Sequence, residues 1–197
     1  MVAYIPVSDW SVRCPHKNYR TLAGEEVWRW TYRAALDSRC FQQVVVLARG
    51  EELILPTIRF KSRTPADRLG NAWEAVSCHV TSGDICLLLP TSPFRNSQHI
   101  VEACARRGER IASVAEIEMR TARELRAHDG QTQIGHLPTS LQLYRSTGGI
   151  QIWNDYDGTV DFWSRPVVPF VLPMPAALDI DTEEDWALAE YYADRLP

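Results

Sequence analysis

The sequence lacks the marks of a secreted, membrane-spanning or zinc-knuckle protein. Its five cysteines are scattered and form no C-x-x-C pair, so neither a disulfide framework nor a zinc knuckle is indicated. No apolar run approaches the roughly 20 residues that a membrane span needs, and no basic segment followed by an apolar one opens the chain. We therefore expect a protein of the reducing cytoplasm with no membrane partner.

An excess of positive charge, internal repeats and low-complexity tracts are absent as well. The formal net charge of -4 argues against a broad basic face, so we expect no nucleic-acid partner. The chain has 197 residues, of which 45% are hydrophobic, and this is enough for one substantial core. We expect residues 1–197 to form a single domain.

The sequence does contain short apolar runs that alternate with amphipathic stretches. This alternation is typical of parallel strands joined by crossover helices, and it predicts an α/β fold with a mostly parallel sheet. The expected strands are Val2–Ile5, Val44–Ala48, Ile85–Leu89, Ile111–Ala115, Gly149–Trp153, Thr159–Trp163 and Val167–Leu172. The expected helices are Glu25–Ser38, Ala66–Val80, Ser97–Arg107 and Thr182–Asp194.

Two of these helices and one further segment carry more detailed expectations. The first helix places Val27, Trp30, Thr31, Ala34 and Ala35 on one apolar face. The last helix has a threonine as its N-cap and two glutamates in its first turn, where the helix dipole favours anions. Between residues 123 and 146 the periodicity fades, and we expect an irregular or hairpin excursion that packs against a partner subunit.

The loop from Ile5 to Asn18 is the first candidate for chemistry. It follows the first expected strand and ends in Arg13, Pro15, Lys17 and Asn18, which supply two cations and an amide. Loops in this position bind phosphate in many α/β proteins, because backbone N–H groups and cations gather at the strand's carboxyl end. An ordinary solvated basic loop is the alternative.

The second candidate is the segment Leu87–Arg95. Here an apolar strand breaks into Pro90-Thr91-Ser92-Pro93, which places two hydroxyls on a rigid backbone at the ligand-binding edge of an α/β sheet. A plain strand-to-helix turn would give the same pattern.

The third candidate is Asp179-Ile180-Asp181, just before the last helix. Alternate residues of an extended segment point to the same side, so both carboxylates can face one hard cation such as Mg²⁺. Helix capping and surface charge are the alternative explanation for two aspartates in this place.

Taken together and in this order, the motifs resemble those of the cytidylyltransferases that make CMP-activated acid sugars. That family, typified by CMP-sialic acid synthetases (acylneuraminate cytidylyltransferases), has an opening I-P-A-R-G-G-S-K-R-I-P-x-K-N and a middle L-Q-P-T-S-P-x-R. It also has a later Y-R-x-N-G-A-I-Y and a closing I-D-I-D-T-x-x-D. The similar segments here are Ile5–Asn18, Leu88–Arg95, Tyr144–Gln151 and Leu178–Asp185. The resemblance spans nearly the whole chain.

The resemblance implies a fold, a reaction and roles for individual residues. The fold would be a Rossmann-like nucleotidyltransferase with three α/β/α layers, in a homodimer. The reaction would be CTP-dependent transfer of CMP to an acidic sugar or related acidic acceptor, with Mg²⁺ as cofactor and pyrophosphate as the leaving group. Arg13, Lys17 and Asp181 would be catalytic, and Asp179 and Asp181 would bind the metal. The nucleotide would contact Ser8, Ser11, Arg13, Lys17, Asn18, Arg63, Thr91 and Ser92, and the acceptor Leu89, Arg145, Thr147 and Gln151.

The chain departs from that family mainly in the first half of the opening loop. Ser8, Asp9, Trp10 and Val12 stand where the family has arginine, two glycines and lysine, a shift of three charge units toward negative. An added carboxylate near a triphosphate opposes its binding. A catalytically impaired paralogue, acting as a nucleotide-binding or partner subunit, is therefore the alternative function. Another reaction on the same scaffold is also left open.

Overall fold

A computed structural model describes residues 1–8, 11–49, 57–59, 76–77, 80–106, 108, 110–117, 143–158, 162 and 166–195. Its strands are β1 (Val2–Ser8), β2 (Thr21–Leu22), β3 (Glu25–Glu26), β4 (Gln43–Arg49), β5 (Thr57–Arg59), β6 (Gly83–Leu87), β7 (Ile111–Ile117), β8 (Leu143–Tyr156) and β9 (Val168–Val171). Its main helices are α1 (Val27–Ser38), α3 (Ser97–Cys104) and α4 (Glu183–Ala193). None of the helices in these ranges is long and apolar enough to cross a membrane.

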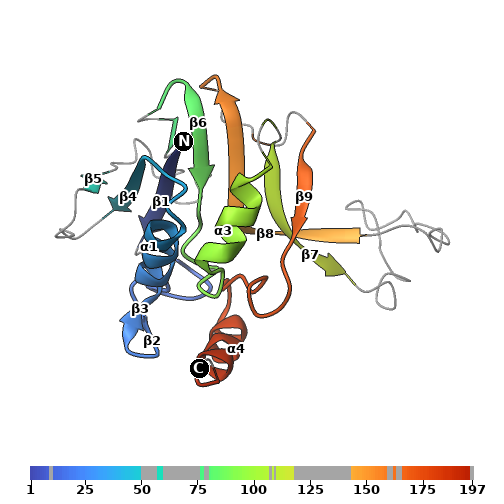
Figure 1. Cartoon of the computed structure of the whole chain (residues 1–197). Coiled ribbons are helices and arrows are strands. Elements are labelled where there is room, and N and C mark those ends of the chain that lie inside the picture. Colours follow the sequence, from blue (N-terminus) through green and yellow to red (C-terminus); the bar gives the residue numbers. More distant parts are fainter. Residues whose placement is uncertain are drawn as a thin grey trace, which may run out of the picture.

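Seven of the described strands form one sheet in the order β5-β4-β1-β6-β8-β7-β9. Every pairing in it is parallel except the two made by β8, which runs antiparallel to β6 and to β7. The prediction of an α/β fold with a mostly parallel sheet is confirmed. The arrowheads of β6 and β9 point toward the end of the sheet at which α4 lies (Figure 1).

The core lies on both faces of this sheet. Ala3, Ile5 and Val7 of β1 face the side that α1 and α3 cover, whereas Tyr4 packs with Trp153 on the opposite side. This alternation follows from the two-residue period of a strand, and α1 and α3 both lie in front of the sheet in Figure 1. Continuous apolar runs such as that of β1 are thus explained by burial on both faces.

Helix α1 begins two residues later than predicted, at Val27. Glu25 and Glu26 instead form β3, which pairs antiparallel with β2. The turn between these strands is Ala23-Gly24, and both residues have positive φ angles, +47° and +85°, as a tight hairpin turn requires. The hairpin therefore takes the first residues of the expected helix.

The buried face of α1 also differs from the predicted one. Trp28 is fully buried, while Trp30 is only half-buried and meets the ring of Phe94 edge-on at 6.0 Å between ring centroids. The other four predicted residues of that face are buried as expected. Trp30 thus lies on the flank of α1, beside Phe94, rather than in its buried face.

Some of the remaining predictions fall on described residues, and others lie outside them. Helices α3 and α4 have the predicted N-terminal boundaries, with Asn96 and Thr182 as side-chain caps, although α3 ends at Cys104 rather than near residue 107. The last four residues of the expected 123–146 excursion, Leu143–Ser146, belong to β8 instead. The rest of that excursion, most of the expected helix 66–80 and most of the expected strand 159–163 lie outside the described residues.

Candidate functional site

Three segments that are far apart in the sequence meet at the carboxyl ends of β1 and β6. The N–H of Ile180 donates to the carbonyl of Thr91 over 2.8 Å, and the Nζ of Lys17 donates to the carbonyl of Ile180 over 2.6 Å. The segment before α4 thus bridges the loop after β1 and the loop after β6. All three sequence motifs contribute to one site.

The two loop cations and Asp181 form the charged centre of this site. Arg13 donates to Oδ2 of Asp181 and Lys17 donates to its Oδ1, both over 2.8 Å. Burial raises the pKa of Asp181, but the hydrogen bond from Lys17 and the charges of Lys17 and Arg13 outweigh burial and bring that pKa below its usual value. Asp181 is therefore firmly ionised at neutral pH.

Arg20 makes a second bridge beside this centre that sequence reasoning missed. It donates to both carboxylate oxygens of Glu183 over 2.8 Å, and its guanidinium lies 3.9 Å above the ring of Trp186. The loop after β1 is thereby clamped to the first turn of α4. Arg20 and Glu183 are 163 residues apart, so no local pattern in the sequence indicates their pairing.

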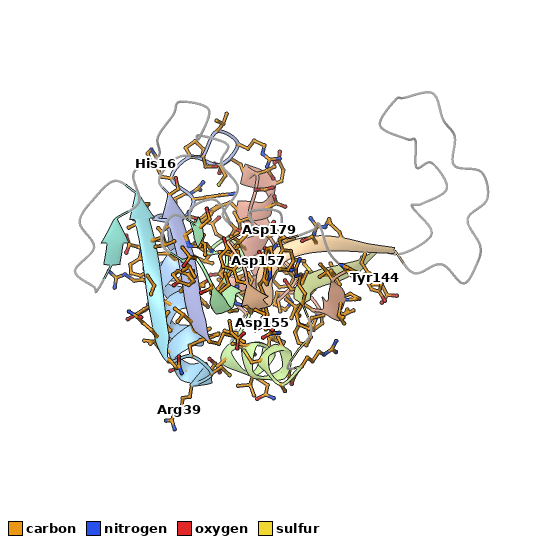
Figure 2. All side chains as sticks on the ribbon, turned by 90° about the horizontal axis from the view of Figure 1, so that it is seen from above. His16, Arg39, Tyr144, Asp155, Asp157 and Asp179 are labelled. Atoms are coloured by element: carbon orange, nitrogen blue, oxygen red, sulfur yellow. The ribbon has the colours of Figure 1, made fainter. Side chains whose placement is uncertain are left out.

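Asp179 has a different environment from Asp181. Burial raises the pKa of Asp179 to about 6, while a hydrogen bond with Thr91 lowers that pKa and the charge of Asp181 raises it. Among the described residues, none donates a hydrogen bond to its Oδ1, which is out of contact with solvent. In Figure 2 Asp179 lies near the middle of the molecule. A carboxylate with a raised pKa, and with one oxygen that no described residue satisfies, is thus held at the centre of the site.

This environment predicts that Asp179→Asn stabilises the metal-free protein at neutral pH. The pKa of Asp179 is higher in the folded chain, so at pH 7 the folded state bears the cost of an ionised carboxylate that the unfolded state does not bear. The gain should be about 3 kcal/mol at pH 7.5 and should disappear as the pH falls from about 6 toward 4. Thermal unfolding of both proteins in a chelator across this pH range measures the difference, and an equal or lower Tm for Asp179→Asn at pH 7.5 would contradict it.

Strand β8 carries the Tyr144–Gln151 motif and bends where that motif lies. Ala112 of β7 pairs with Gln151 and Val114 pairs with Ser146, so residues 147–150 form a bulge opposite the single residue Ser113. The hydroxyl of Ser113 bonds the hydroxyl of Thr147 and accepts from the N–H of Ile150, each over 2.8 Å. The motif therefore encodes a bend in the strand.

Gly148 is needed for this bend. Its φ angle is +65°, and an added Cβ would lie 2.4 Å from Cδ1 of Leu89 in the loop after β6. The bulge is further tied to that loop by Ser92, whose buried hydroxyl donates to the carbonyl of Thr147 over 3.3 Å. Close packing of β8 against the Pro90–Pro93 segment thus requires glycine at position 148.

Arg95 connects several segments of the same region through hydrogen bonds. Its guanidinium is fully buried and donates to the carbonyl of Gly149, to the hydroxyl of Thr31 over 2.7 Å and to the carbonyl of Leu89. Burial lowers the pKa of Arg95 to about 10, so the side chain remains a cation at neutral pH. Arg95 joins α1, β8 and the loop that presents Thr91 and Ser92, a role the sequence motif did not reveal.

The predicted acceptor residues occupy different parts of this framework. Arg145 is exposed on β8, and its charge lowers the pKa of Asp179. Thr147 and Gln151 are buried in the sheet, and Leu89 is half-buried against Gly148. Tyr144, next to Arg145, lies on the arm of β8 that extends away from Asp179 (Figure 2).

The predicted nucleotide residues of the first loop are brought close to β1. The Nδ2 of Asn18 donates to the carbonyl of Ser8 over 3.0 Å, and the hydroxyl of Ser11 accepts from the N–H of Cys14 over 3.4 Å. Asn18 is buried, and its Oδ1 receives no hydrogen bond from the described residues. Arg63, and the Asp9-Trp10 pair of the loop, lie outside the described residues.

Known proteins are similar to this chain in sequence and in fold. No family model matches the chain. The chain is 28% identical to the CMP-N,N'-diacetyllegionaminic acid synthase of Legionella pneumophila, with 96% of this chain and 94% of that protein covered. It is 26% identical to the N-acylneuraminate cytidylyltransferase of Escherichia coli, where it again aligns over 96% of its own length but spans 51% of the relative.

The chain is a homologue of acid-sugar cytidylyltransferases. Solved structures give the same fold at lower identity. A synthetase of CMP:2-keto-3-deoxy-manno-octonic acid, complexed with CTP, superposes with a TM-score of 0.66 at 14% identity and 99% coverage of both chains. The 4-diphosphocytidyl-2C-methyl-D-erythritol synthase of Anaerococcus prevotii superposes with a TM-score of 0.65 at 13% identity and 98% coverage of both. The nucleotidyltransferase fold expected of this homologue is thereby confirmed.

Proposed function

We propose that the protein is a cytidylyltransferase that transfers CMP from CTP to an acidic sugar or a related acidic acceptor. An acceptor oxygen forms a bond to the α-phosphorus, the bond from that phosphorus to the β-phosphate oxygen breaks, pyrophosphate leaves, and the acceptor's proton passes to water. One observation carries the proposal: Lys17, Arg13 and the Asp179–Asp181 pair converge on the Pro90–Pro93 loop at the carboxyl edge of the sheet. The chain that holds them is homologous to such enzymes over 96% of its length.

The chain's own residues contribute positioning and charge. Lys17 and Arg13 would bind phosphate oxygens and balance the charge that builds up on the leaving pyrophosphate. Arg20, held on Glu183 and Trp186, fixes the loop that carries them. Arg145 is an exposed cation of β8 whose charge acts on Asp179, and it is suited to the acidic group of the acceptor.

The two aspartates fit a magnesium ion. Asp179 offers a buried carboxylate oxygen that no described residue satisfies, and Asp181 is an ionised carboxylate two residues further along. Among the described residues, no group of three or more such side chains gathers to hold a metal, so phosphate oxygens would complete the coordination. When bound, the ion would act as a Lewis acid toward the α-phosphate and as a template for the triphosphate.

We further propose that the enzyme acts as a homodimer in the cytoplasm. The four cysteines in the described ranges are Cys14, Cys40, Cys86 and Cys104, and all are free thiols, as a reducing compartment favours. The homodimer rests on the resemblance to acid-sugar cytidylyltransferases. Light scattering on the purified chain measures its oligomeric state.

Calorimetric titration with CTP, CDP and CMP, with and without Mg²⁺, tests the proposed activity. We expect CTP to bind most tightly, and much more tightly with the metal than without it, because the β- and γ-phosphates and the cation neutralise one another in the site. Equal affinities for the three nucleotides, or an affinity for CTP that does not change when Mg²⁺ is added, would instead support the catalytically impaired paralogue. Loss of the cationic residues at positions 8 and 12 is the observation that keeps this alternative open.

A further inference from the structure

The carboxylate of Asp181 is bonded to both of the cations that the proposed reaction needs. Its two oxygens each accept one charge-assisted hydrogen bond, from Arg13 and from Lys17. The same carboxylate is a proposed metal ligand. Without metal and nucleotide, one carboxylate of the protein therefore engages both phosphate-binding cations and cancels one of their two positive charges.

The two cations differ in how strongly they interact with Asp181. The side chain of Lys17 is 14% exposed and is also bonded to the carbonyl of Ile180, whereas that of Arg13 is 66% exposed. A screened surface pair such as Arg13 with Asp181 is weak, and a half-buried pair such as Lys17 with Asp181 is stronger. Nucleotide phosphates must displace Asp181 from Lys17 in particular.

We propose that Asp181 exchanges partners on substrate binding: it leaves Lys17 and Arg13 for the divalent cation and so releases both side chains to the phosphates. This inference rests on the proposed function. Each ligand removes an obstacle for the other, because the metal takes the anion that blocks the cations, and the phosphates take the cations that hold the anion. Nucleotide and metal therefore bind with positive coupling, and the coupling resides in Asp181.

The exchange makes an unusual prediction for Asp181→Asn in the absence of metal. Asparagine is neutral and frees Lys17 and Arg13, so the affinity for CTP measured in a chelator should rise by roughly 5- to 100-fold over that of the unaltered protein. Added Mg²⁺ should then strengthen CTP binding far less than it does in the unaltered protein. Titration calorimetry measures both affinities directly, without turnover.

Glu184→Gln is the matched control. It removes one exposed negative charge from the first turn of α4 without touching the bridge between Arg20 and Glu183. Metal-free CTP affinity should stay within about twofold of the unaltered protein, since a screened charge outside the site contributes little. This control separates exchange from a general gain in positive charge.

Several outcomes would overturn the exchange. Metal-free affinity that is unchanged or weaker in Asp181→Asn would do so, and so would an equal gain in Glu184→Gln. Asp181→Ser serves as a second variant that removes the carboxylate, and far-UV circular dichroism verifies the fold of each. If the unaltered protein binds no CTP even with Mg²⁺, the proposed function fails; if it does bind but Asp181→Asn gains nothing, only the exchange fails.

Discussion

Replacing Asp181 by asparagine is expected to lower magnesium-dependent pyrophosphate release from CTP by at least about 100- to 1,000-fold, the loss typical of removing one preorganised charge-stabilising group. The carboxylate is a proposed metal ligand, and without it the ion that would act on the triphosphate is held by one carboxylate fewer. An enzyme-coupled pyrophosphate assay at saturating CTP and Mg²⁺ measures the loss. Binding and turnover thus change in opposite directions in this variant, since metal-free affinity rises.

The fold should be almost unaffected by that change. The Asp181 side chain is 43% exposed, and exposed ion pairs stabilise a protein by about 0–1 kcal/mol. Glu184→Gln, an exposed charge removal in the first turn of α4, is the control and should retain full turnover. Turnover that survives Asp181→Asn would show that the metal and the cations are organised by other residues.

Replacing Lys17 by methionine should lower kcat/KM for CTP by about 10- to 200-fold. A charge-assisted hydrogen bond contributes about 1.5–3 kcal/mol, and Lys17 is the shielded cation of the site. Methionine keeps most of the apolar stem, so the packing of the side chain changes little. Steady-state kinetics with CTP varied at fixed acceptor concentration measures the effect.

Arg13→Met provides the comparison for Lys17. Arg13 is 66% exposed, so solvent and salt screen its charge and the loss should be smaller than that of Lys17→Met, by about tenfold. Raising the ionic strength should diminish the effect of Arg13→Met more than that of Lys17→Met. Equal losses for both variants, with equal salt dependence, would contradict the ranking.

Local patterns predicted the elements whose residues carry their own signals. The buried apolar run of β1 and the Thr182 cap of α4 were located from their own sequence, because strand burial and capping depend on neighbouring residues. Asp179-Ile180-Asp181 was expected only just before the last helix, whereas the loops after β1 and β6 were expected at the carboxyl edge of the sheet, where the structure has them. The carboxyl ends of parallel strands meet there whatever the details of packing.

The features that sequence reasoning missed depend on contacts between distant segments. Asp181 meets Arg13 and Lys17 across 168 and 164 residues, and nothing local shows that the proposed metal ligand and the proposed phosphate cations are paired. The bend in β8 depends on Ser113 and Arg95, which belong to other elements. Local sequence patterns identify the side chains that can take part in chemistry, but they do not show which of these side chains are paired with one another.

The altered first loop also gains physical meaning from the structure. Val12 stands where the resembled family has a cation, so this position carries no charge. Because Val12 is 79% exposed, it also contributes little packing. The phosphate grip of the described residues then rests on Lys17 and Arg13, both engaged by Asp181. A greater reliance on the metal follows, because the metal both adds positive charge and releases those two cations.

The most direct test is to incubate the purified protein with CTP, Mg²⁺ and a panel of nine-carbon and eight-carbon acidic sugars, and to follow phosphorus by ³¹P NMR. We predict that resonances of pyrophosphate and of a CMP phosphodiester grow together in equal amounts with one acidic sugar, and that a chelator stops both. CTP that stays intact with every acidic sugar, or that is consumed without a CMP conjugate, would contradict cytidylyl transfer.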